Sequence, residues 1–504
     1  MYRQMKRKFF PLTLLLAGVF MLASCLSDDT NESSITLYGD AELTSFAIGT
    51  LNRYYLYNNG DTIKTVAEKT DSTTTVDCSK YKMSIDQLLF VKDEQGNATR
   101  MHPVENVDSL PAGTDVRSVV CTASTKNSGI LTLKRLKKKD TDKDTLDYYN
   151  GDSVDFTKPR EFRVYSTDGS YSRSYQVKLN VHKQLPDSFV WHKQSIESIV
   201  GAMGGTIHGA RLTELNINGE PTIVLALSDG YATYLCTKSI EDDAKPWRVL
   251  SSNPNMVFDG NAYKNVVSFG GHVYLLNGKT LFRAADGENW EHVIPTGFDG
   301  AKQLAGATAG KIYAIADGGL IASADGVNWH AEQLDSEASL LPAEDINICT
   351  MPNRTNQEVE RVIMVGNGNG SNATIWGKIE DPTDDSYKWT LYEGDDKYKL
   401  QNIDGLSVMR YDGKLYAIGG NGQNGSSAAP YAKLYCSIDQ GLTWLESKLF
   451  TLPAGLPKDA NADCIYMTAD SQNHVWIVSA TTGEVWKMRI NRLGWKKEQK
   501  AFGK

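Results

Sequence analysis

The second half of the chain repeats one pattern six times, and this repeat constrains the fold more than any other feature of the sequence. Each copy holds a run of four or five apolar residues between turn-forming residues, which is typical of a buried strand rather than a helix. The six runs are Ile223–Leu227, Val273–Leu276, Ile312–Ile315, Val362–Val365, Leu415–Ile418 and Val475–Val478.

A turn, an apolar pair and a polar turn ending at a tryptophan follow each run. These tryptophans are Trp247, Trp290, Trp329, Trp389, Trp444 and Trp495. With an alternating strand ahead of each run, one copy holds four strands in about 40–60 residues, the size of a propeller blade. The repeat therefore predicts an all-β fold with a six-bladed β-propeller over residues 186–504. A seventh blade is less favoured, because Trp191 has no strands of its own and instead precedes a strand expected to close the ring.

Three of the polar turns share a second motif. Ser437, Asp439, Gly441 and Trp444 match the Asp-box pattern S-x-D-x-G-x-T-W, and Asp325 with Trp329 and Asp286 with Trp290 form one-residue-shorter relatives. In such a turn the carboxylate accepts backbone N–H groups and the indole packs over the hairpin, so the motif is interpreted as structural. Sialidases also carry Asp-boxes, but the arginine motif expected near the start of a sialidase propeller is absent from this sequence.

Residues 35–185 have a different texture. Short alternating segments are separated by clusters of Asp, Asn, Gly and Pro, which predicts a β-sandwich. The strongest local signal is the Asp168-Gly169 turn between 161–165 and 175–181, which resembles the closing hairpin of immunoglobulin-like modules.

The N-terminus predicts export and lipid anchoring. Residues 1–24 combine a basic start, an apolar run too short to span a bilayer and a small-residue cleavage site directly before Cys25. Leu22 to Cys25 resembles the lipobox of bacterial lipoproteins, which implies a lipidated Cys25 and a membrane partner; an ordinary secretory signal is the alternative. The polar segment 25–34 resembles a surface-export signal, which implies the outer face of the outer membrane, and is also compatible with a plain flexible tether.

The lipobox, the sandwich and the Asp-box or kelch-like propeller together resemble an uncharacterised family of Gram-negative surface lipoproteins, the domain-of-unknown-function 6242 family. The resemblance extends over nearly the whole mature chain. It implies the same two-domain layout and brings no catalytic residues with it.

Charge and motif content limit the remaining chemistry. The formal net charge of −8 disfavours a nucleic-acid partner, which needs a basic face. No cofactor and no metal site is predicted: Asp140, Asp142 and Asp144 begin a calcium-loop spacing, but Thr145 and Gly151 stand where an EF-hand needs glycine and an acidic ligand. The six other cysteines are scattered, and Cys236 and Cys436 fall on non-adjacent blades, so no disulfide is expected between them.

Two long polar loops are the best candidates for ligand binding. They join the second and third strands of the fourth and fifth blades, which places them on one face, opposite the Asp-box turns. The candidate rim residues are Asn367, Asn369, Asn372, Trp376, Asn421, Gln423, Asn424 and Tyr431. Amide groups beside an aromatic ring suit the hydroxyls and the apolar face of a sugar; two unrelated flexible insertions are the alternative.

Three functions remain open from the sequence. The favoured one is a non-catalytic, surface-anchored module that binds a glycan or a protein. A propeller glycoside hydrolase or lyase with carboxylates near the central channel is the second, and a structural or adhesin component of an envelope assembly is the third. No catalytic residue is assigned, because the separation of paired carboxylates is a spatial property.

Overall fold

A computed structural model of the chain describes residues 36–53, 56–59, 62–65, 74–87, 89–92, 98–135, 145–149, 151–250, 256–353, 355–356, 358–423, 426, 431, 433–447, 449–457 and 462–495. The predicted signal segment, Cys25, the tether, the 140–144 acidic run and Asn424 lie outside the described residues. Within the described part of the chain, no helix is both long and apolar enough to cross a membrane.

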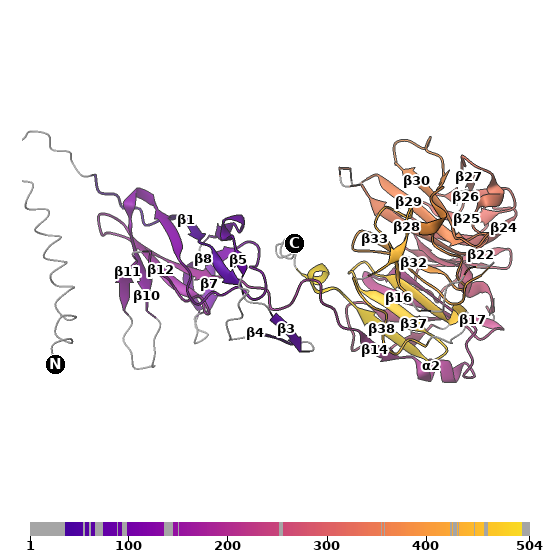
Figure 1. Cartoon of the computed structure of the whole chain (residues 1–504), viewed down its shortest axis with the longest axis horizontal. Coiled ribbons are helices and arrows are strands. Elements are labelled where there is room, and N and C mark those ends of the chain that lie inside the picture. Colours follow the sequence, from indigo (N-terminus) through magenta and orange to yellow (C-terminus); the bar gives the residue numbers. More distant parts are fainter. Residues whose placement is uncertain are drawn as a thin grey trace, which may run out of the picture. The chain divides into compact units, whose positions relative to one another are not determined.

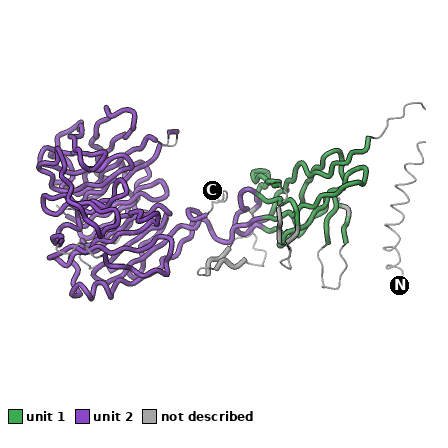
Figure 2. Tube along the Cα trace, turned by 180° about the vertical axis from the view of Figure 1, so that it is seen from behind, with its two compact units in different colours: residues 1–51, 77–106, 115–179 green, residues 52–76, 107–114, 180–504 purple. Residues whose placement is uncertain are grey.

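The chain divides into two compact units (Figures 1 and 2). The first contains residues 1–51, 77–106 and 115–179, and the second contains residues 52–76, 107–114 and 180–504. The domain boundary predicted at residues 185 and 186 therefore lies shortly after this division.

The first unit is built almost entirely from strands. Its largest sheet has seven strands in the order β11-β10-β12-β13-β8-β6 with β7 paired to β8, and β1 pairs with β9 separately. The elements are β1 (Leu43–Ile48), η1 (Cys78–Lys80), β6 (Met83–Ile85), β7 (Leu89–Lys92), β8 (Ala98–Asn106), β9 (Cys121–Thr125), η2 (Lys126–Ser128), β10 (Ile130–Lys134), β11 (Leu146–Tyr148), β12 (Arg160–Tyr165) and β13 (Ser172–Lys178).

Aromatic packing joins the two sheets of this unit. Phe46 from β1 meets Phe162 from β12 edge to face, with ring centroids 5.6 Å apart, and Phe156 packs against both rings. The predicted hairpin is confirmed: β12 and β13 pair antiparallel, and Gly169 in their turn has a φ of 71°, in the left-handed region that favours glycine.

The second unit contains six successive sheets of the propeller. Their orders are β15-β16-β17-β18 with β19 beside β17, then β20-β21-β22-β23, β24-β25-β26-β27, β28-β29-β30-β31, β32-β33-β34-β35 and finally β14-β38-β37-β36. The first strand of each sheet contacts the first strand of the next, and β36 contacts β15, so the sheets follow one another around a closed ring. Each of the six apolar runs predicted as a strand lies in the second strand of its sheet.

The strands of the six sheets vary most in their outer members. Their bounds are β14 (His192–Ser195), β15 (Gly209–Ile217), β16 (Glu220–Ser228), β17 (Ala232–Ser239), β18 (Arg248–Val249), β19 (Phe258–Asp259), β20 (Val266–Phe269), β21 (His272–Asn277), β22 (Thr280–Ala284), β23 (Glu291–His292), β24 (Ala301–Ala307), β25 (Ile312–Ala316), β26 (Gly319–Ser323), β27 (His330–Ala331), β28 (Glu344–Pro352), β29 (Glu360–Asn367), β30 (Thr374–Glu380), β31 (Thr390–Leu391), β32 (Ser407–Tyr411), β33 (Lys414–Ile418), β34 (Tyr435–Ser437), β35 (Leu445–Glu446), β36 (Ile465–Ala469), β37 (Val475–Ser479) and β38 (Glu484–Met488).

Short elements complete this unit. They are β2 (Leu51–Arg53, which begins at the last residue of the first unit's opening segment), β3 (Leu56–Asn59), β4 (Thr62–Thr65), β5 (Thr74–Val76), α2 (Glu197–Ala202), η3 (Ala262–Asn265), η4 (Ala338–Leu340), η5 (Asp396–Tyr398), η6 (Ala462–Cys464) and η7 (Asn491–Gly494).

The core of the propeller lies between neighbouring sheets rather than at one centre. Six apolar clusters of buried residues each draw their members from two adjacent sheets, including the pair formed by the last sheet and the first. Burial of apolar area on both faces of each sheet accounts for the unbroken apolar runs in the second strands.

The seam of the ring corrects one prediction. In five sheets the two-residue outer strand directly follows a repeat tryptophan, and in the sixth sheet that position belongs to β14, which directly follows Trp191. Trp191 packs in the cluster between the fifth and sixth sheets and donates from Nε1 to the carbonyl of Thr451 at 2.9 Å. Trp495, predicted as the sixth repeat indole, instead follows η7 and stacks on His182. The sixth indole therefore comes from the N-terminal end of the domain.

This correction predicts unequal effects of two tryptophan deletions. Trp191→Ala is expected to lower the free energy of unfolding of the propeller by about 2–4 kcal/mol, because it removes a large apolar group from an interface between sheets. Trp495→Ala is expected to cost about 1 kcal/mol or less, because this indole stacks outside the repeat clusters. Urea denaturation followed by near-ultraviolet circular dichroism measures both; equal costs, or a larger cost at Trp495, would contradict the assignment.

Candidate functional site

The propeller has two unlike faces around its central channel. The first strand of each sheet runs antiparallel to the second, so that in the fourth sheet the start of β28 at Glu344 pairs with the end of β29 at Asn367. The connections from second to third strands therefore emerge at the ends where the first strands begin, which we call the loop face. The turns from first to second and from third to fourth strands emerge at the opposite ends, the turn face.

On the loop face, the two predicted loops are joined by the segment between them in space, Leu400–Asp404. Asn402 is fully buried; its side chain donates to the carbonyls of Gly368 (2.9 Å) and Gly370 and accepts from the N–H of Gly368 (3.1 Å). Its backbone carbonyl accepts from the N–H of Gln423 at 3.1 Å, in the other loop. The described parts of the two loops are thus neighbours held by one residue.

Some of the rim residues do reach this surface. Asn369 and Asn421 are exposed, and Asn372 and Gln423 are half-buried, with the Gln423 amide donating to Asp404.

Three other rim assignments are wrong in the exposure they assume. Trp376 is fully buried in the cluster between the third and fourth sheets and donates from Nε1 to the carbonyl of Leu340, so it offers no face to a ligand. Tyr431 is buried against the sixth sheet, and Asn367 is buried with its amide donating to Asp345 Oδ2 and to the carbonyl of Ile403. Sheets covered on both faces bury the aromatic residues of their third strands, which leaves the loop face without the expected aromatic platform.

Asp345 stands where the loop face meets the narrow end of the channel. Its carboxylate accepts from Asn367 Nδ2 at 2.9 Å, and its φ of 52° lies in the left-handed region that Asp and Asn tolerate. Burial raises the pKa of the Asp345 carboxyl to about 6, with Lys264 opposing the shift and Asp463 adding to it. Lys264 forms an ion pair with Asp463 at 3.3 Å, and burial also raises the pKa of the nearby Asp404.

Arg211 closes the channel between its two ends. From β15 its guanidinium donates to the carbonyls of Lys264 at 2.6 Å and Ile346 at 3.4 Å, and it lies 5.6 Å from the centre of the Tyr466 ring. One side chain thereby ties the first sheet to three others. Arg211 lines both the small cavity at the loop face and the larger one at the turn face.

The larger cavity opens on the turn face and has a volume of about 670 Å³. First strands of all six sheets contribute to its wall, which includes many hydroxyl, amide and guanidinium groups. Polar groups on this wall include Thr213, Ser268, Thr350, Arg410, Tyr466 and Asn473. This volume falls within the range of pockets that hold small molecules.

The carboxylates of this wall are all engaged. Glu214 accepts from the N–H and the hydroxyl of Ser471 at 2.7 and 2.5 Å, and Asp412 accepts from Arg492 at 2.7 Å. Asp470 accepts from Trp476 Nε1 at 2.8 Å and lies 2.9 Å from Nδ1 of His474. Although burial acts to raise the pKa of Asp470, its hydrogen bonds to His474 and Trp476 hold that pKa below the usual value.

The Asp-containing turns also lie on the turn face, and their carboxylates bind their own backbone. Asp439 accepts from the N–H and hydroxyl of Thr443 at 2.9 and 2.6 Å, while Trp444 donates from Nε1 to the carbonyl of Gly441. Asp325 and Asp286 accept the corresponding backbone N–H groups of their shorter turns. Within the described residues, no group of three or more His, Cys, Asp or Glu side chains is placed to hold a metal ion.

The profile of the DUF6242 beta propeller domain matches residues 185–498, and that of the DUF6242 N-terminal domain matches residues 46–179. The chain belongs to the DUF6242 family. The family assignment inferred from the sequence is therefore confirmed, as is an all-β fold with a propeller domain. No curated protein matches the sequence significantly.

Solved structures similar to this DUF6242 chain share little sequence with it. A DUF4623 family protein from Bacteroides eggerthii is 12% identical over 89% of this chain and 98% of its own, with a TM-score of 0.31. A Trichoderma reesei Carbohydrate-Active Enzymes Family AA12 protein is 9% identical over 61% and 98%, with a TM-score of 0.36. NanB sialidase from Streptococcus pneumoniae is 12% identical over 66% and 64%, with a TM-score of 0.27. These low values assign no function to the DUF6242 chain.

The raised pKa of Asp345 predicts a pH-dependent stability difference. The folded propeller holds this proton more tightly than the unfolded chain, so the stabilisation is complete below the ordinary value of 3.8 and is lost as pH rises through about 6. Asp345→Asn is therefore expected to raise the free energy of unfolding by about 1–3 kcal/mol at pH 7.5 and to leave it nearly unchanged at pH 4. Urea denaturation at both pH values measures this difference.

The exposed Asp299 supplies a matched control. Asp299→Asn is expected to change the free energy of unfolding by less than about 0.5 kcal/mol at either pH. A stabilisation by Asp345→Asn that is the same at pH 4 and pH 7.5 would contradict the role given to burial.

Proposed function

We propose that this protein is a lipid-anchored lipoprotein of the outer membrane, facing the cell exterior, whose propeller binds a glycan without cleaving it. The observation that carries the binding role is the open cavity of about 670 Å³ on the turn face. Its wall combines hydroxyl, amide and guanidinium groups with the Tyr466 ring, a mixture that suits the hydroxyls and the apolar face of sugars.

Binding rather than hydrolysis is favoured by the state of the carboxylates. Glycosidases need one carboxyl that gives a proton and a second that acts as nucleophile or base. In this cavity Glu214, Asp412 and Asp470 are held by a backbone N–H and hydroxyl, an arginine, and a His–Trp pair. Each would have to leave these partners to act on a substrate.

The anchoring part of the proposal is supported by the sequence. Leu22, Ala23 and Ser24 before Cys25 have the size and polarity expected at a lipoprotein cleavage site, and several acyl chains on one cysteine suffice for lasting attachment. The acidic start of the following tether supports surface display.

A second candidate, a glycoside hydrolase or lyase, is favoured by one observation. Asp345, with its pKa near 6, is close to Asp404 and Asp463 at the loop-face end of the channel. A carboxyl that keeps its proton near neutral pH can serve as a general acid.

A glycan array on the purified protein tests the binding role. Glycans bound by the wild type are expected to lose about tenfold or more in affinity with Arg410→Ala, because the variant removes a charged donor from the cavity wall. The exposed loop-face variants Asn369→Ala and Asn421→Ala serve as matched controls and are expected to bind as the wild type does. Loss of binding in the loop variants alone would overturn the placement in the cavity. Cleavage of a bound glycan that Asp345→Asn abolishes would replace the proposal with the hydrolase or lyase.

Lipid anchoring has its own test. Cys25→Ser is expected to shift the protein from the membrane fraction and to abolish incorporation of a labelled fatty acid, because the hydroxyl replaces the acylated thiol. Protease treatment of intact cells is expected to degrade the wild type. Membrane retention of Cys25→Ser would contradict the anchor, and full protection from protease would contradict surface display.

A further inference from the structure

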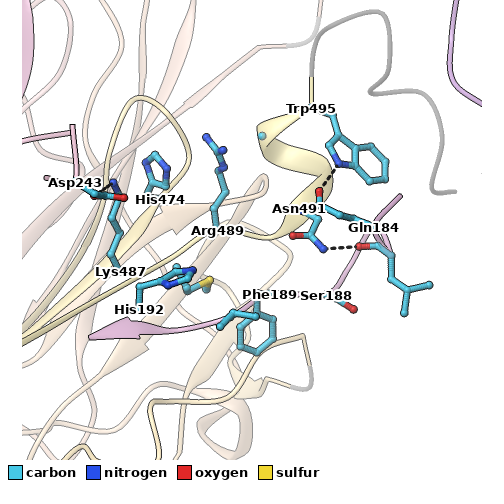
Figure 3. A pocket seen from close by; sticks show the side chains of 14 residues that line it. Gln184, Ser188, Phe189, His192, Asp243, His474, Lys487, Arg489, Asn491 and Trp495 are labelled. Atoms are coloured by element: carbon cyan, nitrogen blue, oxygen red, sulfur yellow. Dashed lines mark hydrogen bonds and ion pairs between the residues drawn. The ribbon is translucent and has the colours of Figure 1, made fainter. Parts of the chain in front are cut away.

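A second pocket lies at the seam where the propeller closes. It has a volume of about 370 Å³ and lies between the strand that enters the ring, with the residues before it, and the last strand with η7. Figure 3 shows Arg489 in the middle of this seam pocket, with His474 and Lys487 to one side and Asn491 and Trp495 to the other.

The charges of the seam pocket leave one cation available. Lys487 is buried and is neutralised by Asp243, whose Oδ1 lies 2.8 Å from Nζ, while Nζ also donates to the carbonyl of Ile240. Asp243 is the only carboxylate among the lining residues. Arg489 forms no ion pair with a carboxylate of the described chain, and its one hydrogen bond given by the structure is to the carbonyl of Gln472 at 3.3 Å. In a chain of net charge −8, an open pocket around an uncompensated guanidinium favours an anionic guest.

Gly494 keeps space for this guanidinium. A Cβ at position 494 would overlap Nε and Cζ of Arg489, so only a glycine in η7 lets the arginine lie in its present place. The φ of Gly494 is outside the left-handed region, so alanine can adopt the same backbone. The requirement for glycine is therefore steric, and it concerns the arginine side chain.

Aromatic and amide groups complete the lining. Trp495 stacks on His182 with ring centroids 3.5 Å apart, which fixes the indole plane, and the Phe189 ring lies on the other strand of the seam. Asn491 is held by donation from Nδ2 to the carbonyl of Leu185 at 2.9 Å, and the exposed His192 offers a ring nitrogen. These groups offer apolar planes and hydrogen-bonding atoms around the arginine.

We propose that the seam pocket binds a carboxylated sugar residue, with its carboxylate on Arg489 and its ring beside the aromatic groups. A guanidinium pairs with a planar carboxylate through two parallel hydrogen bonds, and the volume is sufficient for one sugar residue. This site is separate from the channel cavity: Asn473 and Leu493, joined by a hydrogen bond of 3.3 Å, line the cavity, whereas their neighbours His474 and Gly494 line the seam pocket.

Titration calorimetry of the full-length protein in detergent, at low ionic strength, tests this assignment with glucuronate, glucose and sulfate as probes. Glucuronate is expected to bind, and glucose and sulfate are each expected to bind at least about tenfold more weakly, because one lacks the charge and the other the ring. Equal affinity for glucose would overturn the role of the arginine, and equal affinity for sulfate would overturn the assignment to a sugar.

Two variants remove the arginine's contribution in different ways. Arg489→Gln deletes the charge and Gly494→Ala displaces the guanidinium, and each is expected to weaken glucuronate binding about tenfold or more. Arg361→Gln in β29, away from both cavities, is the matched control for lost charge and is expected to bind as the wild type does. Unchanged binding in Gly494→Ala, with a wild-type circular dichroism spectrum, would overturn the proposal. A loss of glycan binding by Arg410→Ala that leaves glucuronate affinity intact would show that the two sites are independent.

Discussion

The antiparallel pairing of β14 with β38 holds the propeller closed. Every other sheet takes its four strands from one continuous stretch, but the last sheet takes three from the C-terminal end and its outer strand from the start of the domain. Because the six apolar clusters each lie between two neighbouring sheets, an open ring would expose the facing sides of two sheets at once. The channel, the two faces and the seam pocket all depend on this closure.

The regular part of the propeller could be predicted from the sequence because it is written in local patterns. Apolar runs, turn residues and tryptophans recur at comparable spacing, and each second strand lies where its run is. The same regularity misled the assignment of the sixth indole. Trp495 continues the spacing along the chain, whereas Trp191 occupies the equivalent place in space, and only the seam pairing distinguishes them.

The candidate site was harder to predict because its side chains acquire their roles from distant partners. Asn367 and Asn369 are two residues apart, yet one is buried against Asp345 and Ile403 and the other is exposed. Asn402, which joins the two loops, lies in a connection with no motif of its own, and its partners belong to another sheet. The raised pKa of Asp345 likewise comes from burial and from groups on several segments. None of these contacts leaves a periodic signal.

The seam also sets an order of events for the chain. Residues 192–195 leave the translocation machinery long before residues 484–487, so β14 has no partner until nearly the whole domain has crossed the membrane. Joining ends so far apart carries a loop-closure cost of about 5 kcal/mol, which the sheets formed in between can reduce by bringing the ends together. Until then the unpaired edge of β38 and the facing sides of two sheets are exposed to other chains. Periplasmic holding chaperones are thus expected to matter most for this protein during the last step of its export, when the ring is complete except for one strand.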